Sequence, residues 1–186
     1  ETFNQLKGYY PKAKPIQFSY FMSQSHLSGI YFPFSLEANY NDDMCRTNLP
    51  ETVCHELSHL KGFIQEDEAN FISFYATTQC SDDLSFQYSG YLSALEYVHN
   101  EIYNQNITEA FYLTDSISDN VRRDWFRFMP DNYWEENKEK EVIPTETVST
   151  VSTNAIDTNI KVNGRTDGIK SYSLVVELLL DFYYPD

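Results

Sequence analysis

The sequence has few cysteines, few basic residues and no long apolar run, and each scarcity excludes a class of protein. Its three cysteines lack CxxC spacing, so neither a disulfide framework nor a cysteine-rich zinc site is indicated. Lys and Arg number 13 against 28 Asp and Glu, which gives a net charge of −15. Because phosphate binding needs a basic surface, we expect no nucleic-acid partner. The longest apolar run, residues 173–184, contains Glu177 and Asp181 and is too short to span a bilayer.

The remaining composition is that of a globular protein. Hydrophobic residues make up 41% of the 186 residues and aromatic residues 16%, enough for a domain with its own core. No repeat, linker or low-complexity segment divides the chain, so we expect a single domain over residues 1–186. The acidic balance weakly disfavours anionic substrates.

Histidine is also scarce, yet two of the four histidines lie in the pentapeptide His55-Glu56-Leu57-Ser58-His59. This is an HExxH pattern. Residues four apart share one face of a helix, so both imidazoles can reach one metal ion, with Glu56 close to it. That arrangement is used to hold zinc and to activate water for peptide hydrolysis. A surface helix that carries these residues by accident is the alternative, and the surrounding sequence must decide.

The flanking residues predict a helix over residues 48–61. Asn48 is suited to the N-cap position, and Pro50 and Glu51 to the first turn. Gly62 stands where a left-handed residue ends a helix, so the chain can reverse there. A second helix over about 65–80 and a third over about 84–105 follow.

A zinc hydrolase needs a third ligand and leaves the fourth position to water. The acidic cluster Glu66-Asp67-Glu68 opens the second helix directly after the reversal. Glu66 is preferred, because Asn70 lies one turn after it on the same face and can hold a histidine ring. Glu68, Asp67 and His99 stay open as alternatives. In the alternative interpretation these acidic residues bind no metal and only stabilise the positive end of the helix dipole.

These motifs resemble the gluzincin pattern, in which HExxH on one helix is followed by a glutamate ligand, a small residue and Asp or Asn. The match maps the ligand onto Glu66 and the supporting residue onto Asn70. Only six residues separate His59 from Glu66, fewer than most gluzincins have, so the reversal must be tight.

A closer resemblance covers most of the chain. It is carried by the segments 10–15, 29–34, 37–39, 54–63, 66–71, 88–92 and 163–172. Together they are similar to an uncharacterised bacterial family whose members have hydrophobic N-terminal helices before this domain. The resemblance implies a protein held at the cell membrane by segments outside this chain, with its soluble part outside the cytoplasm. It implies no substrate and no oligomeric state.

The chemistry that this pattern predicts is zinc-dependent peptide hydrolysis. Zn²⁺ held by His55, His59 and Glu66 would lower the pKa of its water towards about 7, and Glu56 would take the proton and pass it to the leaving amine. A donor for the developing oxyanion is also needed. Tyr88 and Tyr172, which lie in the recurring segments, are preferred over the other candidates, which are Tyr91, His99 and Arg165.

The segment before the HExxH helix has strand character. Residues 29–34 and 36–41 predict two short strands or one bent one. Zinc peptidases bind substrate against a sheet edge, so residues 36–41, with Ala38 and Asn39, are a candidate edge for a peptide substrate. A purely structural strand is the equal alternative.

We therefore expect an α+β fold that is mostly α. It would contain a zincin-like helix pair at the site, a small edge sheet before it and a C-terminal helical bundle, with helices over about 144–162 and 169–183 and turns at 163–164 and 167–168 between them. The expected function is that of a zinc metallopeptidase acting on a peptide or protein. The alternative is a peptidase-like binding or sensing domain that cleaves nothing.

Overall fold

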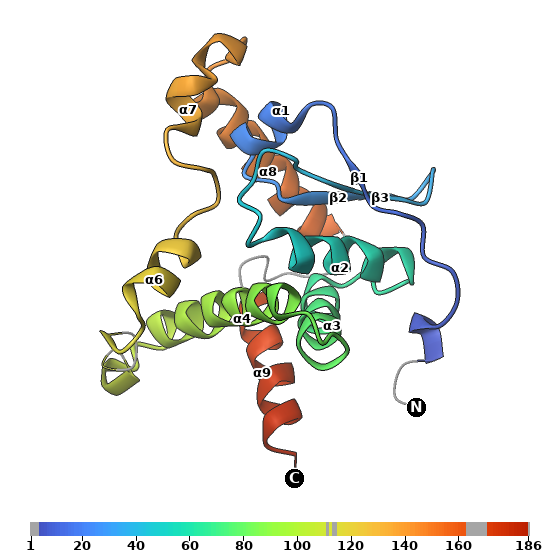
Figure 1. Cartoon of the computed structure of the whole chain (residues 1–186), viewed down its shortest axis with the longest axis vertical. Coiled ribbons are helices and arrows are strands. Elements are labelled where there is room, and N and C mark those ends of the chain that lie inside the picture. The colour runs from blue at the N-terminus through green and yellow to red at the C-terminus, as the bar shows by residue number, and fades with distance from the viewer. Residues whose placement is uncertain (1–3, 111, 113–114, 163–170, 186) are drawn as a thin grey trace.

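The computed structural model confirms a mostly helical α+β fold (Figure 1). It describes residues 4–110, 112, 115–162 and 171–185, so Arg165 and the turns predicted at 163–164 and 167–168 lie outside the described residues. The strands are β1 (Lys14–Pro15), β2 (Gly29–Phe32) and β3 (Glu37–Tyr40). The α-helices are α1 (Ser19–Gln24), α2 (Leu49–Leu60), α3 (Glu66–Gln79), α4 (Leu84–Asn104), α6 (Asp119–Trp125), α7 (Tyr133–Glu136), α8 (Thr145–Val162) and α9 (Ser171–Tyr183). The described residues also form the short 3-10 helices η1 (Asn4–Leu6), η2 (Thr108–Ala110) and η3 (Lys138–Lys140). Within the described part of the chain, none of the helices has both the length and the apolar character needed to cross a membrane.

The sheet corrects the prediction that residues 36–41 form its edge. The strand order is β1-β3-β2, so β3 lies in the centre, parallel to β1 and antiparallel to β2. Lys14 pairs with Asn39, and Ala38 pairs with Tyr31 and is buried. Ala38 and Asn39 therefore cannot offer a free edge to a peptide. The outer strand on the other side is β2.

Helix α2 follows its sequence signals closely at its C-terminal end and less so at its start. Pro50 lies in the first turn as expected, but the side chain of Asn48 makes no capping bond. It donates instead to the backbone oxygen of Arg127, 3.3 Å away. At the other end Gly62 has φ 96°, the N–H of Gly62 bonds the oxygen of His59, and the N–H of Phe63 bonds that of Ser58. This is the Schellman arrangement, which turns the chain directly into α3.

Helix α2 lies between the sheet and helices α3 and α4 (Figure 1). Strands β2 and β3 contact one side of it, and α3 and α4 contact the other. Helix α9 packs in turn on α3 and α4, where Phe74, Val175 and Leu179 form a buried apolar cluster. Apolar burial of this kind is the main stabilising contribution to folding, and it holds the α2–α3 pair from the side opposite the sheet.

Candidate metal centre

The structure brings His55, His59 and Glu66 together across the α2–α3 turn. The two Nε2 atoms lie 3.1 Å apart. The Oε2 atom of Glu66 lies 3.3 Å from Nε2 of His55 and 3.7 Å from Nε2 of His59. Within the described residues, these side chains are a group whose donor atoms can hold one metal ion. Both histidine side chains are largely covered, at 16% and 12% exposure, whereas that of Glu66 is 52% exposed.

The three donor atoms have the spacing that tetrahedral coordination requires. Donors at about 2.0–2.1 Å from a tetrahedral zinc ion lie about 3.3–3.4 Å from one another. The observed separations of 3.1, 3.3 and 3.7 Å bracket this value. Two imidazoles and one carboxylate also form a donor set suited to zinc, with one position left open. The residues present therefore fit such an ion without rearrangement of the backbone.

A backbone oxygen in the turn after α2 fixes the orientation of the His59 ring. The Nδ1 atom of His59 lies 2.8 Å from the oxygen of Phe63, so Nδ1–H donates and the Nε2 lone pair faces the other two donors. Asn70, predicted to hold a histidine ring, has no hydrogen bond to either ring among the described contacts, and its supporting role stays a prediction. Sequence reasoning missed Phe63, because any residue type can supply a carbonyl.

One proton is shared within this group when no metal is bound. Burial lowers the pKa of His55, but its hydrogen bond with Glu66 and the negative charges of Glu56, Glu51 and Glu66 outweigh burial and raise this pKa to about 9. Burial and the neighbouring His55 charge lower the pKa of His59. The pKa of Glu66 is lowered by its bond to His55 and by both histidine charges, although burial opposes this. His55 thus carries the proton and donates it towards its partners.

Glu56 lies on the side of α2 that faces the sheet. It is only 5% exposed. Burial raises the pKa of its carboxyl to about 7, and the negative charges of Glu66 and Glu51 raise it further. The His55 charge and a hydrogen bond from the backbone N–H of Tyr31 lower this pKa, but by less. A carboxyl group that titrates near neutral pH is suited to accept and return a proton in that range. The ring of Tyr31 also lies beside that of His59, with 6.3 Å between ring centroids.

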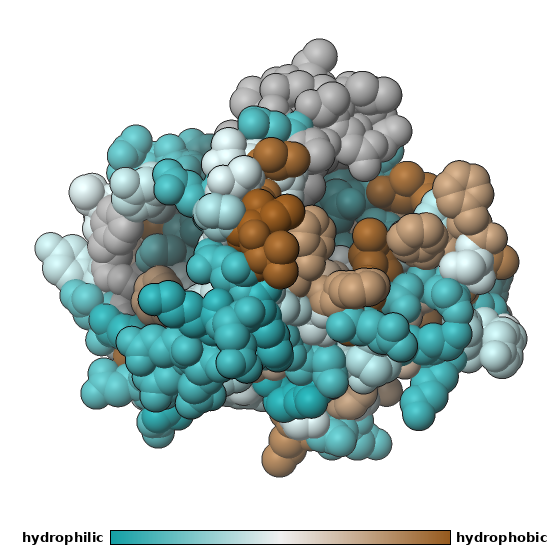
Figure 2. All heavy atoms as spheres, turned by 90° about the horizontal axis from the view of Figure 1, so that it is seen from above, coloured by the Kyte–Doolittle hydropathy of each residue, from teal (hydrophilic) through white to brown (hydrophobic). Residues whose placement is uncertain are grey.

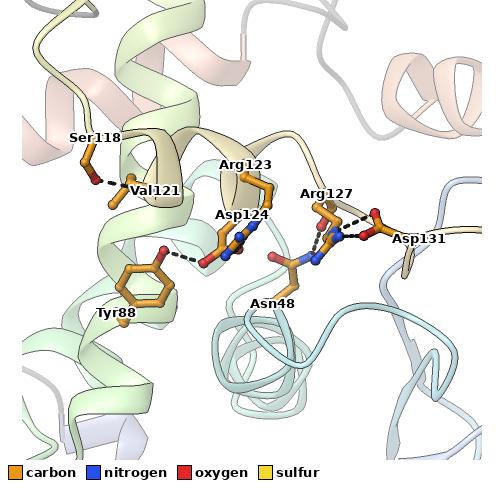
Figure 3. A network of polar contacts seen from close by, with 8 residues as sticks. All are labelled: Asn48, Tyr88, Ser118, Val121, Arg123, Asp124, Arg127 and Asp131. Carbon is orange, nitrogen blue, oxygen red and sulfur yellow. Dashed lines mark hydrogen bonds and ion pairs between the residues drawn. The ribbon is translucent and has the colours of Figure 1, made fainter.

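Tyr88, preferred from the sequence as an oxyanion donor, has a partner on another helix. Its hydroxyl donates to Oδ2 of Asp124 in α6, 2.9 Å away (Figure 3). The same view shows Arg127 paired with Asp131, and Asn48 reaching the backbone of Arg127. These contacts tie α4 and the start of α2 to the segment around α6. The catalytic role of Tyr88 stays a prediction, and the contacts give it a structural role.

The other candidate donors are placed as follows. Tyr172 lies in the first turn of α9, and its side chain is outside the described part of the structure. The ring of His99 packs edge-on against Trp125, with centroids 4.5 Å apart. The ring of Tyr91 packs edge-on against Phe74.

Cys54, next to His55, is partly buried, and burial together with the Glu51 charge raises the pKa of its thiol to about 12, which makes it unreactive.

Two surface clefts lie apart from the metal-ligand group. One of about 900 Å³ is lined by His26 and by residues within 119–135. The other, of about 650 Å³, is lined by α1 and by residues within 15–18, 42–43 and 140–143. Figure 2 looks onto the end of the molecule that carries α7, where brown hydrophobic side chains gather between teal hydrophilic ones. Phe18, Phe21 and Val142 are exposed hydrophobic residues that line the smaller cleft. Neither cleft includes a residue of the metal-ligand group.

Comparison with known proteins gives a family and no activity. No curated protein and no solved structure matches the chain. The model of one family, described as a protein of unknown function (DUF3810), matches residues 1–180. That match spans nearly the whole chain, including both helices of the metal centre. The chain therefore belongs to this family of unknown function, DUF3810.

Proposed function

We propose that the protein is a zinc-dependent hydrolase that cleaves peptide bonds at the His55, His59 and Glu66 group. The observation that carries the proposal is the spacing of the three donor atoms, at 3.1, 3.3 and 3.7 Å, with the buried carboxyl of Glu56 one residue from a ligand. Zinc bound there supplies Lewis acidity, which polarises a carbonyl and lowers the pKa of water towards about 7.

The residues of the chain have separate tasks in this proposal. His55, His59 and Glu66 hold the ion, and the Phe63 oxygen keeps His59 in the tautomer that has Nε2 free. Glu56 accepts the proton of the attacking water and returns it to the leaving amine. The pKa of Glu56, about 7 without a cation, falls when a dication lies nearby, so its carboxylate is ionised and able to accept the proton.

The outer edge of β2 supports the proposal that the substrate is a peptide. The N–H of Asn41 donates to the oxygen of Ser28, so alternate residues Ile30 and Phe32 turn their polar groups towards β3. Gly29 and Tyr31 consequently turn theirs to the outer side, where no further strand is paired in the described structure. The N–H of Tyr31 faces Glu56 there, so the groups left for a peptide are those of Gly29 and the oxygen of Tyr31. An extended peptide can add to such an edge. This edge replaces residues 36–41 as the candidate substrate strand.

The proposal is tested by a peptide-library digest with purified protein. One sample is stripped with a chelator, and a second is stripped and reloaded with zinc. We expect cleavage in the reloaded sample only. His26→Asn serves as the matched control, because His26 is an exposed histidine outside the group and asparagine tolerates its φ of 54°. Zinc binding without cleavage would favour a non-catalytic binding or sensing domain.

A further inference from the structure

The carboxyl group of Glu56 lies directly against the backbone of strand β2. A methyl group built on Gly29 would lie 2.5 Å from Oε1, 2.7 Å from Cγ and 2.8 Å from Cδ of Glu56. Contacts this short are closer than real side chains allow, so any larger residue at position 29 must displace the Glu56 side chain. Gly29 is needed for this close approach and not for a left-handed backbone, because it lacks the positive φ of Gly8 and Gly62.

Tyr31 lies two residues after Gly29, so both residues present the same side of the strand to α2. The backbone N–H of Tyr31 lowers the pKa of the Glu56 carboxyl, against the larger effect of burial, and so favours its ionised form. The close contact at Gly29 is what limits the position of Glu56.

We infer that Gly29 is a positioning residue for Glu56, so that β2 aligns the proton acceptor with the candidate metal centre on α2. This inference rests on the proposed hydrolase function for its catalytic consequence. Its structural part, the coupling between Gly29 and Glu56, stands on the contacts alone. The two parts call for separate measurements.

The first measurement is a stability cycle with Gly29→Ala and Glu56→Ala. We expect Gly29→Ala to lower the melting temperature on the order of 5 °C when Glu56 is present, because overpacking is destabilising. In the Glu56→Ala background the same change should have little effect, since the clashing atoms are gone. Equal losses in both backgrounds would overturn the coupling, whether or not the protein has any activity.

Gly90→Ala provides the matched control for this cycle. A methyl group there would lie 2.1 Å from Oγ1 of Thr77, at the contact of α4 with α3. This change should lower the melting temperature to the same extent in both backgrounds. It separates a general packing defect from a specific effect on Glu56.

The second measurement is cleavage by zinc-loaded protein. Gly29→Ala should bind zinc within a few-fold of wild type, keep its KM and lose on the order of 10²-fold in kcat, because a misplaced base loses its contribution. Wild-type kcat in Gly29→Ala would overturn the positioning role. A wild-type protein that binds zinc but cleaves nothing would instead overturn the proposed function. The stability cycle would still test the contact between Gly29 and Glu56.

Discussion

The Nδ1 atom of His59 lies 2.8 Å from the backbone oxygen of Phe63, so the turn that ends α2 also orients one of the three candidate metal ligands. The same turn brings Glu66 to within 3.7 Å of His59. The reversal at Gly62 therefore sets both the contact of His59 with the Phe63 oxygen and the distance between His59 and Glu66. The backbone conformation of Gly62 thus contributes to the geometry of the candidate metal centre.

Gly62→Ala should weaken both the fold and the metal centre. Gly62 has φ 96° and no atom within 4 Å of a methyl group built on it, so the effect comes from backbone conformation alone. We expect a loss of about 1–2 kcal/mol in the free energy of unfolding and a zinc affinity lower by up to about tenfold. Thermal melting and zinc titration measure the two effects. Gly62→Asn is the control and should cost less, because asparagine tolerates a left-handed conformation; equal losses for both variants would contradict this explanation.

Removal of any one ligand should abolish tight zinc binding. We expect His55→Ala, His59→Ala and Glu66→Ala each to lower zinc affinity by more than about 100-fold, because loss of a residue that only holds a ligand in place already costs about 10–100-fold. Wild type and His26→Asn should bind one zinc ion per chain. Metal analysis after dialysis measures the stoichiometry. A Glu66→Ala protein that keeps wild-type affinity would show that another group is the third ligand.

Zinc binding should release about one proton from His55 near pH 8, and at neutral pH a further fraction of a proton from Glu56, whose pKa of about 7 falls beside the cation. The pKa of His55 is about 9 without metal, because its bond to Glu66 and nearby carboxylate charges favour the imidazolium. Below that pH the ion must displace this proton, so zinc affinity should rise by about tenfold per pH unit and level off above the pKa. Calorimetric titration in buffers of different ionisation enthalpy counts the protons. An affinity that does not change with pH between about 7 and 9 would contradict this assignment.

The local elements of the site follow from the sequence, and its long-range contacts do not. Helix α2 covers Leu49–Leu60 where residues 48–61 were predicted, because Pro50 and Gly62 mark its ends. The spacing of His55 and His59, followed by the reversal, was sufficient to predict Glu66 as their neighbour. Asn48 holds the predicted N-cap position, but its side chain makes no capping bond, because its amide donates to the backbone oxygen of Arg127 after α6.

The arrangement of the sheet could not be predicted from the same signals. Strand β1 consists of Lys14 and Pro15 and has no alternating pattern, so the sequence does not predict it, and β3 is expected at an edge although it lies in the centre. Gly29 contacts Glu56, 27 positions later in the chain, because Gly29 has no side chain to keep the two apart. The Phe63 carbonyl is likewise independent of residue type. Such backbone contacts leave no pattern in a single sequence.

Tyr88→Phe separates the structural role of Tyr88 from the catalytic role predicted for it. The hydroxyl donates to Asp124 at 2.9 Å, so we expect its removal to lower the free energy of unfolding by about 1–2 kcal/mol. Zinc affinity and kcat should stay close to wild type. Chemical denaturation and the peptide assay measure these quantities. A fall of about 100-fold in kcat with unchanged stability would restore Tyr88 as an oxyanion donor.

The most direct test of the proposed function compares zinc-loaded Glu56→Gln with zinc-loaded wild type. Glutamine keeps the size of the side chain and an oxygen that can accept the bond from Tyr31, but it cannot take up a proton at neutral pH. We predict that the variant binds one zinc ion with wild-type affinity and loses about 10²–10⁴-fold in kcat on a peptide that wild type cleaves. A variant that retains its zinc and cleaves that peptide at the wild-type rate would contradict the role of Glu56 and the hydrolytic mechanism built on it.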